Sequence, residues 1–305
     1  MITADMVKKL RERTGAGMMN CKRALTDANG DIDKAIEILR EKGLAAAAKK
    51  AGRIASEGLV ETYLSPDGIY GSIVEVNCET DFVAKNDDFI SFTKGIAKQA
   101  AYSKASNVDE LLNEKYAEGE GTVKDALTGL ISKLGENMNL RRFQRFAKED
   151  NEILKDYIHG GGRIGVLVQL ACRNTEGLDN VAKEIALQVA AASPQYITKD
   201  QVTSDVIEKE KEIYKAQAIN SGKSEAIAEK MVNGRLQKYF KEVCLIEQLW
   251  IRDQDLTIKE YLDQKSKEMG APISIKRFVR FEKGEGIEKK AEDFAAEVQA
   301  QINKA

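Results

Sequence analysis

The middle of this 305-residue chain contains one segment twice, and this duplication limits the folds that the chain can adopt. When the sequence is compared with itself at an offset of 94 residues, a tyrosine, a glycine, a valine and a cysteine recur in the same order. The matched pairs are Tyr63 and Tyr157, Gly71 and Gly165, Val74 and Val168, and Cys78 and Cys172. Each copy consists of two β-type runs joined by a turn, at 59–78 and at 153–172. The chain is therefore predicted to contain the same β-hairpin twice.

Each hairpin is followed by a helical pattern and then by a closing strand. The helices are expected at 87–102 and 180–192, and the strands are LRRFQRF (140–146) and IKRFVRF (275–281). The strands align at an offset of 135 residues, so the second copy contains 41 additional residues. A surplus of this size indicates an inserted element, because loops within compact domains are much shorter.

The insertion is predicted to be an antiparallel coiled-coil hairpin over 201–243, since two helical patterns flank the break Ser221-Gly222-Lys223. An arm of this kind is typical of an oligomer or partner contact. Its expected lining residues are Val206, Ile213, Ala216 and Ile219 in one helix, and Ile227, Met231 and Phe240 in the other.

The first 55 residues predict a small three-helix module. Thr3 and Asp31 are favourable N-caps, and Gly15, Gly30 and Gly43 are expected to separate helices of about 10 residues. Residues 44–52 are expected to form a helical or frayed linker, and a last helix is expected over 287–302. The predicted fold class is α+β with antiparallel three-stranded sheets. The expected domains are the N-terminal module (1–55), two core subdomains (56–148 and 149–282) and a C-terminal module (283–305).

Composition narrows the range of functions. Charged residues make up 31% of the chain and nearly cancel, at a net charge of −2, which gives no electrostatic footprint for duplex nucleic acid. The four cysteines are far apart without a CxxC pair, so neither a zinc site nor a disulfide framework is indicated. Neither a signal sequence nor an apolar run of about 18 residues occurs. A soluble, cytoplasmic protein without a cofactor is predicted.

Several motifs have an ordinary structural interpretation beside a functional one. The segment 160–165 matches GxGxxG, but it lies between two strands and does not open a helix, so it is interpreted as a turn. The only histidine, His159, is either a turn residue or a partner contact. The two Arg-Phe strands are either a platform for single-stranded RNA or sheet strands with paired arginines, and the balanced charge favours the latter. An interaction protein is favoured over an enzyme.

The two copies diverge directly after their matched cysteines. Thr80-Asp81-Phe82-Val83 in the first copy corresponds to Asn174-Thr175-Glu176-Gly177 in the second, so the shared scaffold does not require Phe82. A large apolar side chain in a polar turn normally has an apolar partner, either the protein's own core or another molecule. The polar run that follows Val83 favours an outward direction. Met18 and Met19 begin the second helix, and one is expected in the core and the other on the surface.

Five segments together resemble the translation elongation factor Ts family, in its bacterial form. They are RTGAGMMNCKRAL (13–25), NCETDFVAKND (77–87), HGGGRIGVLV (159–168), AEKMVNGR (228–235) and FEKGEGIEKKAEDFAAEV (281–298). The bacterial form is indicated because the arm is present and no transit segment is expected before Met1. The resemblance implies guanine-nucleotide exchange on elongation factor Tu, without catalytic chemistry, nucleic acid or membrane binding.

The resemblance also implies which residues contact the GTPase. The N-terminal module is similar to ubiquitin-associated folds and contacts the partner through Met18 and Met19. The motif Thr80-Asp81-Phe82-Val83 brings Asp81 and Phe82 to the partner's magnesium site, where they displace the ion. His159 meets the nucleotide domain, although the Gly-Gly-Gly turn beside it departs from the bulkier third residue of related proteins. The helix after Gly286 contacts the GTPase, and the arm implies a homodimer or a heterotetramer of two copies of each protein.

Overall fold

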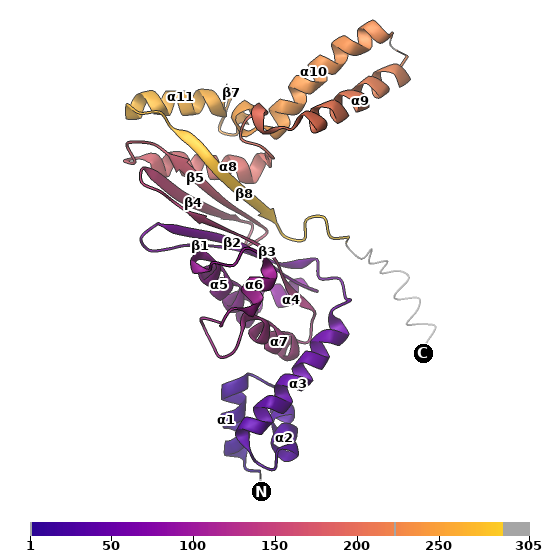
Figure 1. Cartoon of the computed structure of the whole chain (residues 1–305), viewed down its shortest axis with the longest axis vertical. Coiled ribbons are helices and arrows are strands. Elements are labelled where there is room, and N and C mark those ends of the chain that lie inside the picture. Colours follow the sequence, from indigo (N-terminus) through magenta and orange to yellow (C-terminus); the bar gives the residue numbers. More distant parts are fainter. Residues whose placement is uncertain (1, 223, 289–305) are drawn as a thin grey trace. The chain divides into compact units, whose positions relative to one another are not determined.

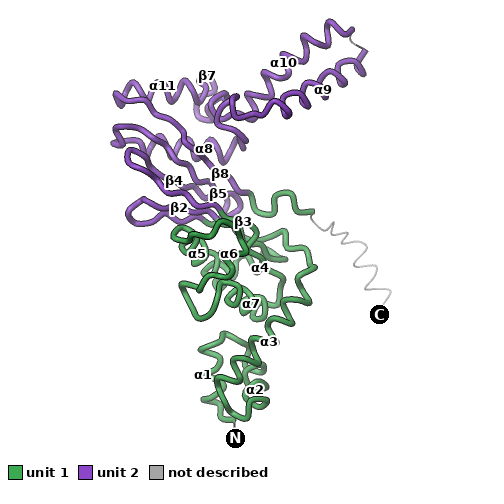
Figure 2. Tube along the Cα trace, viewed as in Figure 1, with its two compact units in different colours: residues 1–61, 74–143, 282–305 green, residues 62–73, 144–281 purple. Residues whose placement is uncertain are grey.

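The computed structural model describes residues 2–222 and 224–288 (Figure 1). The chain divides into two compact units (Figure 2). The first combines the described residues of 1–61, 74–143 and 282–305, and the second combines 62–73 with 144–281. Helices and antiparallel three-stranded sheets alternate along the chain, so the predicted α+β class is confirmed. The predicted domain boundaries stay predictions.

The N-terminal module consists of α1 (Ala4–Thr14), α2 (Met18–Asp27) and α3 (Ile32–Lys50). Both predicted N-caps are confirmed: the Thr3 side chain accepts from the Met6 N–H, and the Asp31 side chain accepts from two backbone N–H groups. Gly15 ends α1 in the left-handed conformation, at φ +64°. The core of the module is formed by fully buried apolar side chains, namely Leu10, Cys21, Ala24, Leu25 and Ala35.

The expected helix end at Gly43 is wrong, because α3 continues through this residue for 19 residues in all. Gly43 is buried where α3 packs on α7 (Val123–Leu134). A Cβ atom at position 43 would lie 3.6 Å from Thr128 Cγ2 and 3.8 Å from Ser132 Cβ. Gly43 therefore lies inside α3 at its contact with α7, where a methyl group would make ordinary van der Waals contacts, and it does not end the helix.

The sheet of the first copy has the order β1 (Glu57–Leu64), β2 (Tyr70–Cys78), β3 (Met138–Ala147). Its hairpin turn is at Ser65–Gly68, as predicted, with the Gly68 N–H donating to the Ser65 carbonyl. The chain then forms α4 (Asp81–Ala84), α5 (Asp87–Tyr102), α6 (Val108–Asn113) and α7. The sequence predicted α5 with its observed bounds but missed α6 and α7.

The sheet of the second copy has the order β4 (Glu152–His159), β5 (Ile164–Ala171), β8 (Ser274–Glu282). The predicted hairpin is confirmed, and its antiparallel register runs from Glu152 opposite Ala171 to His159 opposite Ile164. Helix α8 (Leu178–Ala192) packs on β4 and β5. The sequence missed the small hairpin of β6 (Leu249–Trp250) and β7 (Asp253–Thr257), helix α11 (Ile258–Met269), and two short 3-10 helices, Lys199–Gln201 and Leu245–Glu247.

The insertion forms a helical hairpin of α9 (Ser204–Asn220) and α10 (Glu225–Val243), as predicted (Figure 1). Its expected lining is largely wrong, because Ile213, Ile219 and Ile227 are 40–50% exposed. The buried side chains of these helices are Ala218, Ala228, Val232, Leu236, Phe240 and Val243. Of the residues expected to line the arm, only Phe240 is among these buried side chains.

Two further expectations concern the C-terminal helix and membrane-spanning segments. The helix expected at 287–302 lies outside the described residues beyond Glu288. Across the described helices, no segment is both long enough and apolar enough to span a bilayer.

Gly43 yields a test of the helix contact. Gly43→Ala should stabilise the protein by about 1 kcal/mol, because alanine favours a helix interior and its methyl group would make ordinary van der Waals contacts. Gly43→Leu should destabilise it, since a larger side chain has to push α3 away from α7. Urea unfolding of both variants measures the two effects. A loss of stability with alanine would contradict the packing described above.

Candidate functional site

The divergent segment after the first hairpin forms a short, exposed turn of helix. Strand β2 ends at Cys78, and Thr80 is the N-cap of α4, with its hydroxyl accepting from the Val83 N–H at 3.4 Å. Phe82, the second residue of this helix, is 82% exposed, whereas Ala84 is buried. Phe82 is therefore not a core residue, and the predicted outward direction is supported.

A carboxylate from a distant part of the chain holds this turn. Glu136, between α7 and β3, accepts the backbone N–H groups of Glu79 and Thr80 at 3.1 and 3.0 Å and the Thr80 hydroxyl at 2.6 Å. In return, the Glu79 carboxylate accepts the backbone N–H of Asn137. Hydrogen bonds to charged groups are stronger than neutral ones. The two glutamates thus cross-link the base of the Phe82 turn to the corner before β3.

Cys78 adds a further hydrogen bond at the same place. Its thiol donates to the Thr80 carbonyl oxygen, with 3.1 Å between Sγ and O. Burial raises the pKa of the Cys78 thiol to about 12, and the negative charges of Glu136 and Glu57 act in the same direction. The thiol consequently keeps its proton, and its role as donor, at physiological pH.

Asp81 lies at the surface beside Phe82. Its carboxylate accepts from Lys85 Nζ at 2.6 Å, and this hydrogen bond, together with the positive charge of Lys85, lowers the pKa of Asp81. Ion pairs exposed to solvent contribute little to stability. Asp81 can therefore exchange Lys85 for another cationic partner at small cost.

The second copy retains the cysteine as Cys172 but lacks the carboxylate and the side-chain N-cap. Its corresponding residue, Glu176, is exposed in a turn, and α8 begins after Gly177 without a side-chain cap. The position 135 residues after Glu136 is Ala271, which has no carboxylate. The brace and the exposed aromatic therefore occur together in one copy and are both absent from the other. This pairing indicates that the brace serves Phe82 and not the shared scaffold.

The other predicted contact residues are also at the surface. Met18 and Met19 are each 60% exposed, so the expectation that one of them packs in the core is wrong. Cys21, Ala24 and Leu25 fill the core of the module from the same helix. His159 is exposed at the end of β4, where its Nδ1 lies 3.0 Å from the Tyr157 hydroxyl. Met18, Met19 and Phe82 belong to the first unit and His159 to the second.

The glycine-rich turn beside His159 is a hairpin turn, as predicted. Gly160, Gly161 and Gly162 have φ values of +61°, +64° and +91°, which side chains other than glycine rarely adopt. The segment joins β4 to β5 and opens no helix, so the geometry of a dinucleotide site is not present at this turn.

The Arg-Phe strands do not present free cations for RNA. Arg141 and Arg142 form ion pairs with Glu75 at 3.0 and 2.6 Å. In the second copy, Arg277 donates to the Gln169 side chain and lies 3.8 Å from the centre of the Phe146 ring. These contacts support the interpretation as sheet strands, in which the guanidinium groups are engaged within the protein.

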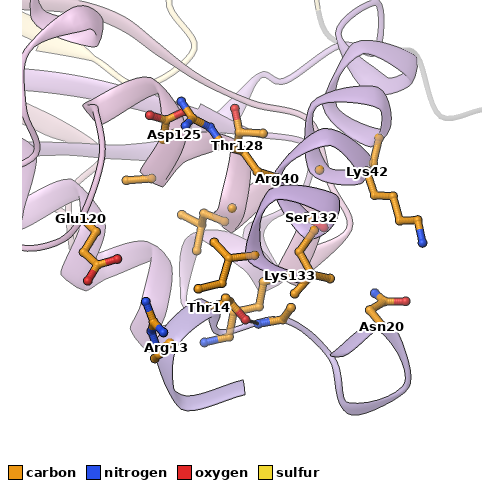
Figure 3. A pocket seen from close by; sticks show the side chains of 18 of the residues that line it. Arg13, Thr14, Asn20, Arg40, Lys42, Glu120, Asp125, Thr128, Ser132 and Lys133 are labelled. Carbon is orange, nitrogen blue, oxygen red and sulfur yellow. Dashed lines mark hydrogen bonds and ion pairs between the residues drawn. The ribbon is translucent and has the colours of Figure 1, made fainter. Parts of the chain in front are cut away.

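A pocket of about 650 Å³ lies between the N-terminal module and α7 (Figure 3). Its cationic side chains have acidic partners within the protein: Arg13 with Asp33, Arg40 with Asp125, Lys42 with Asp27, and Lys133 with Asp88. The rim thus offers no uncompensated charge to an anionic ligand. Within the described part of the chain, no three His, Cys, Asp or Glu side chains are grouped so as to hold a metal ion.

A large apolar side chain that is exposed on a braced turn is typical of a protein that contacts another macromolecule. The chain is thus an α+β protein with a duplicated core and an exposed Phe82 on a braced turn. Residues 79–285 match the family model described as Elongation factor TS.

Close relatives extend this match over nearly the whole chain. The chain is 64% identical over 304 residues to elongation factor Ts of Clostridium kluyveri, with 99% of each chain covered. It is 61% identical over 305 residues to elongation factor Ts of Clostridium botulinum strain Eklund 17B, with full coverage of both. The chain is 59% identical over 305 residues to elongation factor Ts of Clostridium botulinum strain Loch Maree, with 99% of each chain covered. The chain belongs to the elongation factor Ts family.

Glu136 provides a test of the brace. Glu136→Ala should leave both copies folded, because the second copy has alanine at this position, but should cost about 1–2 kcal/mol in the free energy of unfolding. The backbone N–H groups of Glu79 and Thr80 should then exchange with solvent faster, as measured by hydrogen exchange. Glu136→Gln, which retains one acceptor oxygen, should have a smaller effect. Unchanged exchange at Thr80 would contradict the brace.

Proposed function

We propose that this protein is a guanine-nucleotide exchange factor that promotes GDP release from elongation factor Tu in the cytoplasm, without catalytic chemistry of its own. The observation that carries the proposal is Phe82, which is 82% exposed on a turn held by Glu136. In the proposed mechanism, Asp81 and Phe82 enter the partner's magnesium site and loosen the nucleotide. Membership of the elongation factor Ts family supports this role in translation elongation.

The physical requirement on an exchange factor is a difference in affinity. It has to bind the nucleotide-free GTPase more tightly than the loaded form, and reciprocity then weakens nucleotide binding by the same factor. Magnesium bridges the phosphate oxygens and protein ligands, so displacing its ligands weakens the hold on GDP without any covalent step. Because the turn is already ordered in the free protein, little conformational entropy is lost when Phe82 enters the partner.

The other exposed residues fit secondary contacts with the same partner. Met18 and Met19 place two flexible, polarisable side chains at the start of α2, where they can adapt to an apolar surface. His159 presents its ring beyond the end of β4, in an orientation set by Tyr157. Thr80 and Val83 form the ends of the turn that presents Asp81 and Phe82.

Phe82→Ala should slow factor-stimulated GDP release by about 10- to 100-fold, since burying a Phe side chain contributes about 1.5–3 kcal/mol. The midpoint of urea unfolding should hardly change, because the side chain is exposed. Stopped-flow fluorescence of labelled GDP on elongation factor Tu measures the first quantity. The matched control is Glu176→Ala in the second copy, which should alter neither.

The same measurement tests the role of magnesium. When chelator removes the ion, GDP release should accelerate without the factor, and the factor should then give a smaller fold-increase. An undiminished fold-increase would show that exchange proceeds through other nucleotide contacts. A Phe82→Ala variant with markedly lower stability would show that Phe82 contributes to the core, contrary to the proposal.

We assign the arm formed by α9 and α10 to association rather than to exchange, either with a second copy of the chain or with elongation factor Tu. Its exposed Ile213, Ile219 and Ile227 are available for such contacts. Replacing the arm with a short Gly-Ser turn should leave a folded protein with modestly reduced exchange and weaker association, as measured by sedimentation with and without the partner. Complete loss of exchange with retained binding would contradict this assignment.

A further inference from the structure

Strand β2 carries a fully buried carboxylate, that of Glu75. It accepts hydrogen bonds from Arg141 Nη1 (3.0 Å), Arg142 Nε (2.6 Å), Asn77 Nδ2 (3.0 Å) and the backbone N–H of Gly284 (2.8 Å). Burial by itself would raise the pKa of Glu75. The hydrogen bonds from Gly284 and Asn77 and the charge of Arg142 outweigh burial, so its pKa lies below the ordinary value. The buried group is therefore a fully engaged carboxylate.

The groups around Glu75 hold the segment that follows β8. Arg142 Nη2 donates to the Glu282 carbonyl at 3.2 Å and to the Glu285 carboxylate at 3.1 Å. Arg141 donates to the Glu285 carbonyl, and Lys283 pairs with Glu57 at the start of β1. The chain passes from the second unit to the first at Glu282, where this set of contacts begins (Figure 2).

The contact at Gly284 requires glycine. Its φ is +68°, and a Cβ atom there would lie 2.2 Å from the Ser56 carbonyl oxygen. No side chain fits in this space without moving the backbone. The segment 282–286 is therefore seated on the first unit through a close backbone contact as well as through charged hydrogen bonds.

The second copy has an amide at the position of this carboxylate. The residue 94 positions after Glu75 is Gln169, and the residue 135 positions after Arg142 is Arg277. Gln169 Oε1 accepts from Arg277 Nε at 2.6 Å, the same distance as between Glu75 and Arg142 Nε. A neutral amide thus makes the hydrogen bond between the middle strand and the closing strand equally well.

Glu75 and Gln169 differ in their other hydrogen-bond partners. In the second copy, Gln169 Nε2 donates to the Ala147 carbonyl at the end of β3 (3.2 Å) and to the Glu152 carboxylate (2.6 Å). In the first copy, Glu75 Oε1 accepts the Gly284 N–H while Oε2 accepts Arg142 Nε, so both oxygens act as acceptors, whereas a glutamine would offer only one. The middle strand therefore carries the carboxylate only in the copy that binds residues 282–286, whereas the second copy places its carboxylate at Glu152 of β4.

We propose that Glu75, Arg141 and Arg142 form a socket that seats residues 282–286, the start of the C-terminal segment, on the rest of the first unit. Glu75 is then a positioning residue for that segment. If, as the proposed function holds, the C-terminal segment contacts elongation factor Tu, the socket sets the affinity of the factor for its partner. The maximal rate of GDP release, which depends on Phe82, is unaffected by the socket.

Limited proteolysis of the full chain tests the socket directly. Glu75→Gln introduces the residue of the second copy, and Gly284→Ala displaces the segment without altering Glu75. Both should speed tryptic cleavage after Lys283 about tenfold or more, as expected for the loss of a hydrogen bond to a charged group. Mass spectrometry of the fragment ending at Lys283 measures this rate. The matched control is Glu152→Gln, which alters a buried carboxylate of the second copy and should leave the rate unchanged.

The outcomes separate the two proposals. Selective cleavage after Lys283 in both variants supports the socket. An unchanged rate in Glu75→Gln, or an equal rise at sites throughout both units, overturns it. In the exchange assay, Glu75→Gln should raise the concentration of factor needed for half-maximal GDP release several-fold and retain the maximal rate. If the wild-type protein does not stimulate GDP release, the proposed function fails, and the proteolysis still decides whether the socket exists.

Discussion

Hydrogen bonds from backbone N–H groups to two carboxylates hold the outward-facing segments of the first unit in place. Glu136 binds the amides of Glu79 and Thr80 and so holds the turn that exposes Phe82. Glu75 binds the amide of Gly284 and so holds the start of the C-terminal segment. Both carboxylates are fully or partly removed from water, where a charged hydrogen bond is stronger and an unpaired group is costly. The polar groups of this unit therefore fix its outward-facing elements.

The duplication shows that the fold accepts other residues at the positions of Glu136, Glu75 and Phe82. The second copy builds the same three-stranded sheet with Ala271, Gln169 and Glu176 at the positions of Glu136, Glu75 and Phe82. A chain that contains both versions shows which residues the scaffold requires and which it tolerates. The substitutions Glu136→Ala and Glu75→Gln therefore test function on a fold that accepts those residues elsewhere in the same molecule.

Much of the fold follows from local pattern, and for that reason the sequence predicted it. Alternating apolar residues around turns gave both hairpins, and helical spacing gave α5 and the two helices of the arm. Helices α6, α7 and α11 were not predicted, although α7 and α11 are separated by the same 135-residue offset as the closing strands and each begins with a capping box. Comparison of the copies also predicted Phe82, since a residue absent from one copy cannot be required by the shared scaffold.

The sequence by itself determined the duplicated α+β scaffold, the inserted arm and the residue that the first copy exposes. Only the tertiary structure decided which residues support it. Gly43 looked like a helix end because its contact with Thr128 is 85 residues away, and the buried face of the arm depended on the partner helix. Glu136 is 56 residues from Thr80, and Glu75 is 209 residues from Gly284. Hydrogen bonds across such distances leave no periodic trace in the sequence, because the folded backbone alone brings their partners together.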